Sequence, residues 1–181
     1  MTAAKILVAD PLQPSGIAIL RRGGAEVHEV TAEERARLPE LVADADALVV
    51  RSMTKVTADL LRAGKKLRVV GRAGVGVDNV DVEAATEMGV LVVNAPTANL
   101  LSATEHTFAL LLALARNVPA ADASLKGGAW ERGRFQGQEL QGKRLGVVGF
   151  GRIGQQVAER ARAFGMEVGR ASCRERVWIP V

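Results

Sequence analysis

The first half of the chain contains short apolar runs that recur about every 20 residues. Each run is only four or five residues long, and most are rich in Val, Leu, Ile and Ala, as buried strands are. Each interval is long enough for one helix, and this alternation predicts βαβ units in a parallel sheet with helices on both faces. A leucine-rich solenoid repeats at a similar interval, but no L-x-x-L-x-L pattern recurs, so it is the less favoured alternative. The five runs are residues 6–9, 26–30, 47–50, 67–70 and 90–93.

Helix start and stop signals lie between these runs. Thr31 and Glu34 have the spacing of a capping box and predict a helix over residues 36–42. Asp81 is a good N-cap for a later helix, which Gly89 ends.

The pattern changes after residue 96. Ser102 and Glu105 repeat the capping-box spacing and predict a strongly apolar helix to about residue 117, which Pro119 ends. A helix over residues 120–126, a polar stretch, a strand over 144–148 and a helix over 152–164 follow, the last with Ala158, Ala161 and Phe164 facing inward. We therefore expect one domain over residues 1–96 and part of a second α/β domain over residues 97–168.

A glycine-rich turn joins the strand and the helix of this second domain. Its residues are Gly149, Phe150, Gly151, Arg152, Ile153 and Gly154, in the pattern G-x-G-x-x-G. Between strand and helix the three glycines provide a tight turn, close approach to a pyrophosphate and close helix packing, so we favour dinucleotide binding over a merely tight turn.

The carboxylate that completes such a site is missing. It is expected near residue 172, where the chain has Ser172 between Arg170 and Arg174. These arginines are compatible with NADP rather than NAD, or with a tail that is not native.

Two further segments favour anion binding in the first domain. Arg51 and Ser52 follow one apolar run, and the glycine-rich residues 71–79 follow another. Ligands bind beyond the carboxyl ends of parallel strands, and an arginine there can grip a carboxylate or phosphate through two hydrogen bonds. A solvated surface arginine is the alternative.

Several classes of function are disfavoured. The longest apolar run, residues 108–115, is too short to span a bilayer, and no secretory signal precedes residue 10. The lone Cys173 cannot build a disulfide framework. We therefore expect a cytoplasmic protein. The net charge is only +4 with scattered Lys and Arg, which argues against nucleic acid. His28 and His106 are expected to be structural, and nothing indicates a metal site.

Six motifs occur in order along the chain: AD at 9–10, VRS at 50–52, GRAGVGVDNVD at 71–81, NAPTAN at 94–99, WER at 130–132 and GFGRIG at 149–154. Together they resemble the phosphoglycerate-oxidising branch of the D-isomer-specific 2-hydroxyacid dehydrogenases. The resemblance runs from about residue 4 to residue 168. It implies a flavodoxin-like substrate domain followed by the start of a Rossmann NAD-binding domain.

The resemblance also implies roles for individual residues. Substrate contacts would come from Arg51, Ser52, Gly74, Val75 and Gly76, with Arg132 reaching the substrate phosphate from a partner subunit. Cofactor contacts would come from Val75 and from Gly149, Phe150, Gly151, Arg152, Ile153 and Gly154. A homo-oligomer through the apolar helix 102–117 is expected.

The implied reaction is the NAD-dependent oxidation of D-3-phosphoglycerate to 3-phosphohydroxypyruvate, the first step of serine biosynthesis. The family's catalytic Arg, Glu and His would lie beyond residue 181, so no catalytic residue is assigned in this chain. Residues 169–181 depart from the family pattern and look like a translated sequencing adapter. Two alternatives stay open: a dehydrogenase of glyoxylate, hydroxypyruvate or lactate, and a non-enzymatic flavodoxin-like binding module.

Overall fold

The computed structural model describes residues 3–172 and 175–180, with side chains described up to residue 170. The chain divides into two compact units between Ala98 and Asn99.

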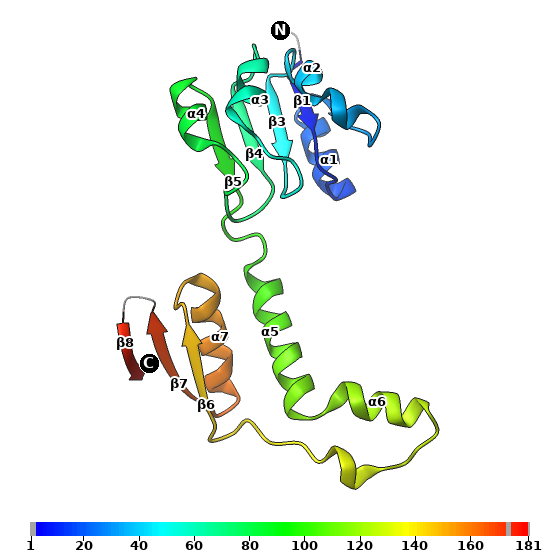
Figure 1. Cartoon of the computed structure of the whole chain (residues 1–181), viewed down its shortest axis with the longest axis vertical. Helices are drawn as coiled ribbons and strands as arrows, with labels where there is room; N and C mark the ends of the chain where they lie inside the picture. The colour runs from blue at the N-terminus through cyan, green and yellow to red at the C-terminus, as the bar shows by residue number, and fades with distance from the viewer. Residues whose placement is uncertain (1–2, 173–174, 181) are drawn as a thin grey trace. The chain divides into compact units, whose positions relative to one another are not determined.

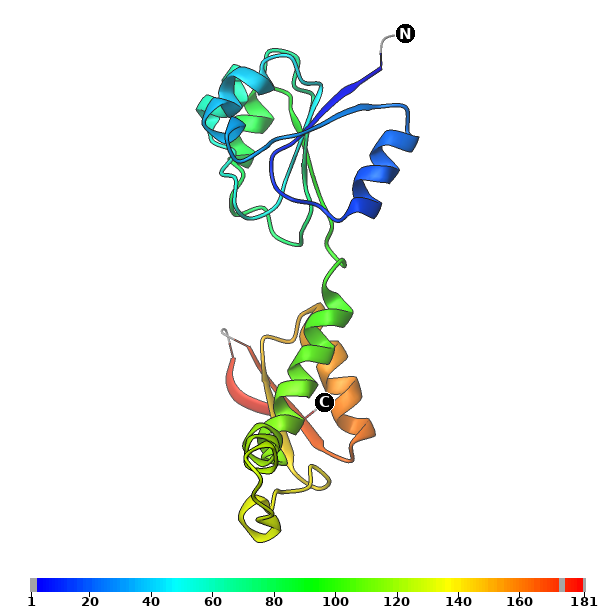
Figure 2. The same cartoon turned by 90° about the vertical axis from the view of Figure 1, so that its right-hand side faces the viewer.

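Unit 1 is a five-stranded, all-parallel sheet in the order β2-β1-β3-β4-β5. This is the flavodoxin-like strand order, which confirms the predicted fold class. Helix α1 covers one face and α2, α3 and α4 cover the other (Figures 1 and 2). The elements are β1 (Lys5–Val8), α1 (Pro14–Arg22), β2 (Glu26–Glu29), η1 (Glu34–Arg37), α2 (Leu38–Val42), β3 (Ala47–Val50), α3 (Ala58–Ala63), β4 (Val69–Arg72), α4 (Val82–Glu87) and β5 (Leu91–Asn94).

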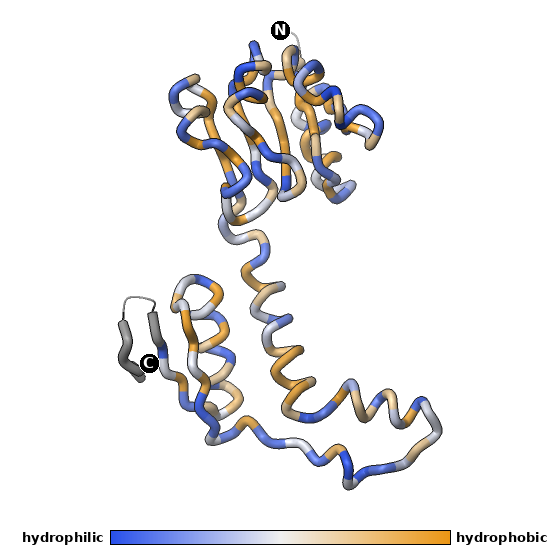
Figure 3. The backbone as a smooth tube through the Cα atoms, in the orientation of Figure 1, coloured by the Kyte–Doolittle hydropathy of each residue, from blue (hydrophilic) through white to orange (hydrophobic). Residues whose placement is uncertain are grey.

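The central strands form the core of unit 1. Leu48, Val50 and Val70 are completely buried, and the register places Leu48 beside both Leu7 and Val70. Figure 3 shows these central strands as the continuous hydrophobic part of the unit. Strands buried on both faces read as unbroken apolar runs, which is why the sequence revealed them.

Two expectations for unit 1 need correction. The capping box forms, since the Thr31 amide donates to Glu34 and the Glu34 amide to Thr31, but it opens the 3-10 helix η1 instead of one helix over 36–42. Pro39 lies in the first turn of the separate helix α2, where its missing N–H is tolerated. The strand expected at 67–70 begins at Val69, because the Leu67 amide closes a turn onto the Gly64 carbonyl.

Unit 2 consists of α5 (Leu100–Ala115), α6 (Val118–Lys126), η2 (Arg132–Phe135), β6 (Arg144–Val148), α7 (Arg152–Ala163), β7 (Glu167–Ser172) and β8 (Glu175–Pro180). Strands β6 and β7 are parallel and joined by α7, which confirms the expected βαβ unit, while β8 runs antiparallel to β7. The core combines residues of α5, α7 and the sheet: Phe108, Val147, Val157, Ala158, Ala161, Met166 and Val168.

The start of α5 differs from the expected one. The helix begins at Leu100 with Asn99 as N-cap and no side-chain cap, so Ser102 and Glu105 lie inside it and form no capping box. Pro119 lies in the first turn of α6 instead of ending α5, which stops at Ala115. The local spacing was therefore a chance match to the capping pattern.

Helix α5 also leaves much of its apolar surface uncovered. Leu110 is 59% and Leu114 79% exposed, in the half of α5 that is most hydrophobic in Figure 3. Among the described residues no single helix is long and apolar enough to cross a bilayer; α5 and α6 reach that length only together, across a 63° bend. Phe164, expected to face inward, is 43% exposed and stacks on Phe108 with ring centroids 5.4 Å apart.

Candidate functional site

The loops at the carboxyl edge of the unit 1 sheet carry the candidate substrate residues. Arg51 and Ser52 directly follow β3, and the glycine-rich loop with Gly74, Val75 and Gly76 follows β4. Neighbouring parallel strands bring these two loops to the same edge, and the Ala73 amide donates to the Val50 carbonyl at 2.8 Å. The structure therefore brings the five candidate residues of unit 1 together.

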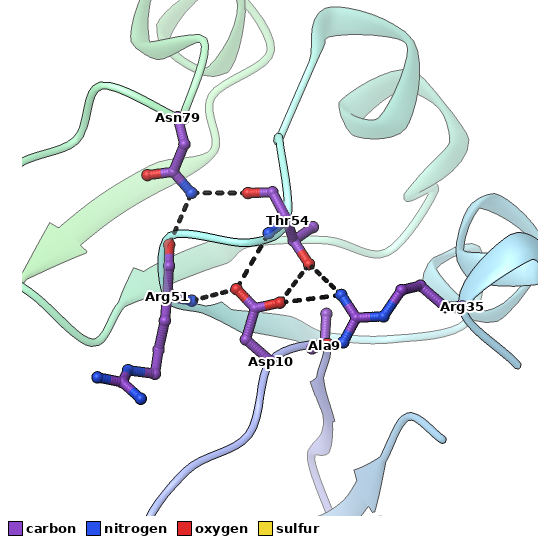
Figure 4. Close-up of polar contacts among 6 residues, drawn as sticks. All are labelled: Ala9, Asp10, Arg35, Arg51, Thr54 and Asn79. Atoms are coloured by element: carbon purple, nitrogen blue, oxygen red, sulfur yellow. Dashed lines mark hydrogen bonds and ion pairs between the residues drawn. The ribbon is translucent and has the colours of Figure 1, made fainter. Parts of the chain in front are cut away.

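A buried carboxylate, that of Asp10, lies beneath the loop that follows β3 (Figure 4). Its Oδ2 accepts hydrogen bonds from the amides of Arg51 at 2.7 Å and Thr54 at 3.1 Å. Its Oδ1 accepts from the Thr54 hydroxyl at 2.6 Å and from Arg35 Nη1 at 3.2 Å, while Arg35 Nη2 donates to the Ala9 carbonyl at 2.9 Å. Burial by itself raises the pKa of Asp10, but the bonds from Thr54, Arg51 and Arg35 outweigh it and hold that pKa below its usual value.

Asn79 holds the same loop from the other side. Its Nδ2 donates to the carbonyls of Arg51 at 2.7 Å and Thr54 at 2.6 Å. Its Oδ1 accepts from Arg72 Nε at 3.3 Å. The Arg51 backbone is thus bonded through both its N–H and its C=O.

The Arg51 side chain takes no part in this network. Its guanidinium points away from Asp10 in Figure 4, and Arg51 is exposed. Its guanidinium makes no hydrogen bond or ion pair with residues 3–170. An exposed, unpaired guanidinium on a firmly held backbone is suited to bind a carboxylate or phosphate.

The glycine-rich loop after β4 folds over Arg72. A Cβ at Gly74 would lie 2.5 Å from Arg72 Nη1, so the absence of a side chain there makes room for the guanidinium. The loop is tied to the end of β5, since Asn94 Nδ2 donates to the Val75 carbonyl at 2.5 Å and the Ala95 amide to the Gly74 carbonyl at 2.9 Å. Val75 itself is 38% exposed and faces solvent at this edge.

An open hollow of about 430 Å³ adjoins these loops. Because Ser52 contributes to its wall, it is a candidate space for part of a small anionic ligand. Its lining residues are Ser52, Lys55, Val56, Thr57, Asp78, Asn79, Val80 and Asp81.

In unit 2 the three glycines of the turn between β6 and α7 differ in what a side chain would meet. Gly149 has φ +90°, which L side chains rarely adopt, and a Cβ at Gly154 would lie 2.4 Å from the Gly149 carbonyl oxygen. A Cβ at Gly151 would meet nothing within 4 Å. Gly151 is also the N-cap of α7, and no side chain caps that helix.

This turn fits the pyrophosphate of a dinucleotide. The space beside Gly151 lets phosphate oxygens approach the backbone, and the N-terminal end of α7 offers N–H donors and a partial positive charge. The remaining expected contacts, Phe150, Arg152 and Ile153, belong to the same turn and the first residues of α7. Ser172, near which the ribose-binding carboxylate is expected, is the last residue of β7, while Cys173 and Arg174 lie outside the described residues.

Arg132 lies apart from this turn. It begins the short helix η2, which is at the opposite end of unit 2 from the β6–α7 turn (Figures 1 and 2). Its guanidinium stacks 5.7 Å from the ring centre of Trp130, which is 72% exposed.

Sequence reasoning missed the residues that support Arg51. Asp10 occurred in a motif but had no role; an acidic residue directly after a buried strand is the available signal. Arg35 and Thr54 carried no signal, because their contact with Asp10 depends on the tertiary fold. His28 Nε2 lies 3.1 Å from Glu34 Oε2, and within the described chain no cluster of His, Cys, Asp and Glu could hold a metal ion.

Comparisons with known proteins agree with this architecture. The sequence model for the catalytic domain of D-isomer specific 2-hydroxyacid dehydrogenases matches residues 6–172. A D-3-phosphoglycerate dehydrogenase of Methanocaldococcus jannaschii is 59% identical over 164 residues, which are 91% of this chain and 31% of that protein. The chain thus spans about a third of the length of this relative.

Solved structures show the same similarity. A Thermus thermophilus protein is 37% identical, with a TM-score of 0.85, covering 95% of this chain and 57% of that one. A D-lactate dehydrogenase of Aquifex aeolicus, complexed with NAD and lactic acid, is 25% identical, with a TM-score of 0.80, covering 95% of this chain and 52% of that one. The family resemblance drawn from the sequence motifs is confirmed: the chain belongs to the D-isomer specific 2-hydroxyacid dehydrogenases.

Proposed function

We propose that this chain supplies the substrate-binding loops and the cofactor phosphate-binding turn of an NAD-dependent dehydrogenase that oxidises D-3-phosphoglycerate. The observation that carries the proposal is the exposed, unpaired guanidinium of Arg51 at the carboxyl edge of unit 1. The identity of the M. jannaschii relative supports a phosphorylated substrate.

Each substrate residue has a specific task in this proposal. Arg51 binds the substrate carboxylate or phosphate through paired hydrogen bonds, and Ser52 adds a hydroxyl donor beside it. The backbone of Gly74, Val75 and Gly76 lies close to the bound acid. Arg132 is assigned to the phosphate of a substrate bound by a partner subunit, as the family resemblance implies.

Bound NAD would supply the acceptor for the hydride at C2 of the hydroxy acid. In the cofactor site, the turn is kept compact by Gly149 and Gly154, and Gly151 leaves space for phosphate oxygens. The N-terminal end of α7 binds the pyrophosphate. Phe150, Arg152 and Ile153 flank that pyrophosphate, while Val75 contacts the nicotinamide. The choice of NAD over NADP is part of the proposal and rests on the NAD complex of the A. aeolicus neighbour.

Association and location belong to the same proposal. The exposed leucines of α5 support a homo-oligomer formed through this helix. A cytoplasmic location is supported by the relative's name, which is that of a metabolic dehydrogenase.

A second candidate is the oxidation of an unphosphorylated D-2-hydroxy acid such as lactate, or the reduction of glyoxylate or hydroxypyruvate. The lactic acid complex of the A. aeolicus neighbour favours it. The substrate site of unit 1 suits any small carboxylate, so the preference has to be measured.

A chimera tests the proposal. Residues 1–168 are joined to the remaining part of the M. jannaschii relative, and NAD reduction is followed with 3-phosphoglycerate and with D-lactate. We expect a clear preference for 3-phosphoglycerate. Arg51→Gln should lower kcat/KM by about tenfold to a hundredfold, since a lost charge-assisted hydrogen bond costs about 1.5–3 kcal/mol.

Arg62→Gln is the matched control, because Arg62 is an exposed arginine of α3 that pairs with Asp59. It should leave kcat/KM unchanged. A preference for D-lactate would favour the second candidate, and an inactive chimera that folds and binds neither acid would favour a non-enzymatic binding module.

A further inference from the structure

We infer that Asp10 and Asn79 are positioning residues for Arg51, and that they act by fixing its peptide groups from opposite sides. The inference rests on the proposed function, because it takes Arg51 as the anion-binding residue. It goes further by assigning a task to two residues that do not themselves touch the substrate.

The contacts to Arg51 are complementary. Asp10 Oδ2 accepts from the Arg51 amide at 2.7 Å, and Asn79 Nδ2 donates to the Arg51 carbonyl at 2.7 Å. Because both hydrogen-bonding groups of its backbone are occupied, the Cα–Cβ direction of Arg51 is fixed while its side chain remains available (Figure 4).

The same two residues also fix the other end of the loop. Asp10 accepts from the Thr54 amide and hydroxyl, and Asn79 donates to the Thr54 carbonyl at 2.6 Å. Residues 51–54 are therefore held at both ends by side chains from outside the loop. Thr54 is 6% and Asp10 2% exposed, so water does not replace these bonds easily.

Both supports are themselves held in place. Arg35 bonds Asp10 and the Ala9 carbonyl, and Arg72 bonds the Asn79 side-chain oxygen at 3.3 Å. Arg72 has a side chain only 13% exposed, beneath Gly74 of the second substrate loop. The supports thus connect the ends of β1, β3 and β4 in one network. Affinity for an anion depends on such prior ordering, because a loose loop must be ordered when the ligand binds.

The test measures the affinity of the full 181-residue chain for 3-phosphoglycerate by calorimetry, at a temperature where every variant is folded. Asp10→Ala removes the acceptor of the Arg51 amide, and Asn79→Asp replaces the donor to the Arg51 carbonyl by an acceptor of the same shape. Each should weaken binding about tenfold.

Asp10→Asn is the conservative variant. Its side-chain oxygen will face the two amides, because the alternative orientation would place NH₂ against two N–H donors. Its NH₂ then replaces Oδ1, where it can donate to the Thr54 hydroxyl but loses the bond from Arg35 Nη1. It should therefore bind within about twofold of the unchanged chain. Hydrogen exchange of the Arg51 amide should be slow in the unchanged chain and in Asp10→Asn, and faster in Asp10→Ala.

Val70→Ala is the matched control for lost stability. Val70 is completely buried in β4, and its aliphatic side chain makes no hydrogen bond to the network. If Asp10→Ala and Asn79→Asp bind as well as Val70→Ala, while Arg51→Gln loses binding, the positioning inference is overturned and the substrate assignment stands. If Arg51→Gln binds as well as the unchanged chain, Arg51 is not the anion site and both assignments are overturned.

Discussion

A methyl group at position 154 would collide with the backbone of the turn to which Gly154 belongs. The added Cβ would lie 2.4 Å from the Gly149 carbonyl oxygen and 3.1 Å from Val147 Cγ1. The nearest of these atoms belongs to the backbone, so it cannot swing aside as the end of a flexible side chain can. Helix α7 must therefore move away from β6, which disturbs the core formed by Val147, Val157 and Ala158.

The expected loss in the free energy of unfolding of Gly154→Ala follows from two opposing effects. Overpacking of a tight contact costs about 1–3 kcal/mol, while alanine gains up to about 1 kcal/mol over glycine within a helix. The net loss of about 1–2 kcal/mol should lower the Tm of unit 2 by roughly 5–15 °C, since a unit of this size loses about 4–8 °C per kcal/mol.

Gly151→Ala is the matched variant from the same turn. A Cβ there meets nothing within 4 Å, and φ −81° is accessible to alanine. Stability should change by less than about 1 kcal/mol, although alanine is a poorer N-cap than glycine. The methyl group would, however, occupy the space that phosphate oxygens need.

Scanning calorimetry of the chain and NAD titration of the chimera separate the two effects. Gly154→Ala should lower Tm, and Gly151→Ala should keep Tm but weaken NAD binding. A Tm of Gly154→Ala equal to or above that of the unchanged chain would refute the packing argument. Undiminished NAD binding by Gly151→Ala would refute the cofactor assignment of the turn.

Three other predictions concern charge and association. The pKa of Asp10 is lowered in the folded chain, so the stabilisation from its carboxylate is complete above the unfolded pKa of about 4 and is lost as pH falls through the lower folded pKa. The free energy of unfolding, measured with urea, should therefore depend less on pH below about 4 in Asp10→Asn than in the unchanged chain. An equal dependence on pH in the two proteins would contradict this. Hydrogen bonds from Lys5 and Lys66 lower the pKa of Asp44 to about 2, and Lys66→Gln should raise it in an NMR titration, whereas an unmoved pKa would exclude the Lys66 contact. Sedimentation should show self-association that Leu114→Lys reduces, and a monomeric unchanged chain at tens of micromolar would count against the α5 interface.

Features that are encoded in a few consecutive residues could be predicted from the sequence. The Asp81 side chain accepts from the Ala84 amide at 3.0 Å, as its N-cap position predicts, and Gly89 follows the helix with φ +70°. Runs such as residues 47–50 form the strand with the same bounds. In these cases the signal lies within a few consecutive residues.

The start of α5 shows where such local rules fail. Ser102 and Glu105 have the correct spacing for a capping box, yet the helix already begins at Leu100. Ala103 donates to the Asn99 carbonyl at 2.9 Å, so the intrahelical hydrogen bonds begin one turn earlier than the pattern suggests. A spacing rule recognises a compatible pair, but it does not exclude a start upstream of that pair.

The residues that hold the Arg51 backbone could not be predicted either, and the reason is different. Asp10 and Arg51 are separated by 41 residues, and Asp10 and Arg35 by 25. Only the strand order of the sheet places the end of β1 beside the end of β3. A sequence without a fold therefore identifies Arg51 as a candidate ligand-binding residue but not the groups that orient it.

The buried Asp10 carboxylate also explains why the Arg51 guanidinium remains available. A buried carboxylate attracts the nearest cation, and Arg51 is close enough to donate its own amide to it. Arg35, Thr54 and two backbone amides already bond both carboxylate oxygens, however, and bonds from Arg35 also reach the Ala9 carbonyl. With its charge compensated by Arg35, Asp10 has little to gain from the second guanidinium, whose charge is left for a ligand at the open edge of the sheet.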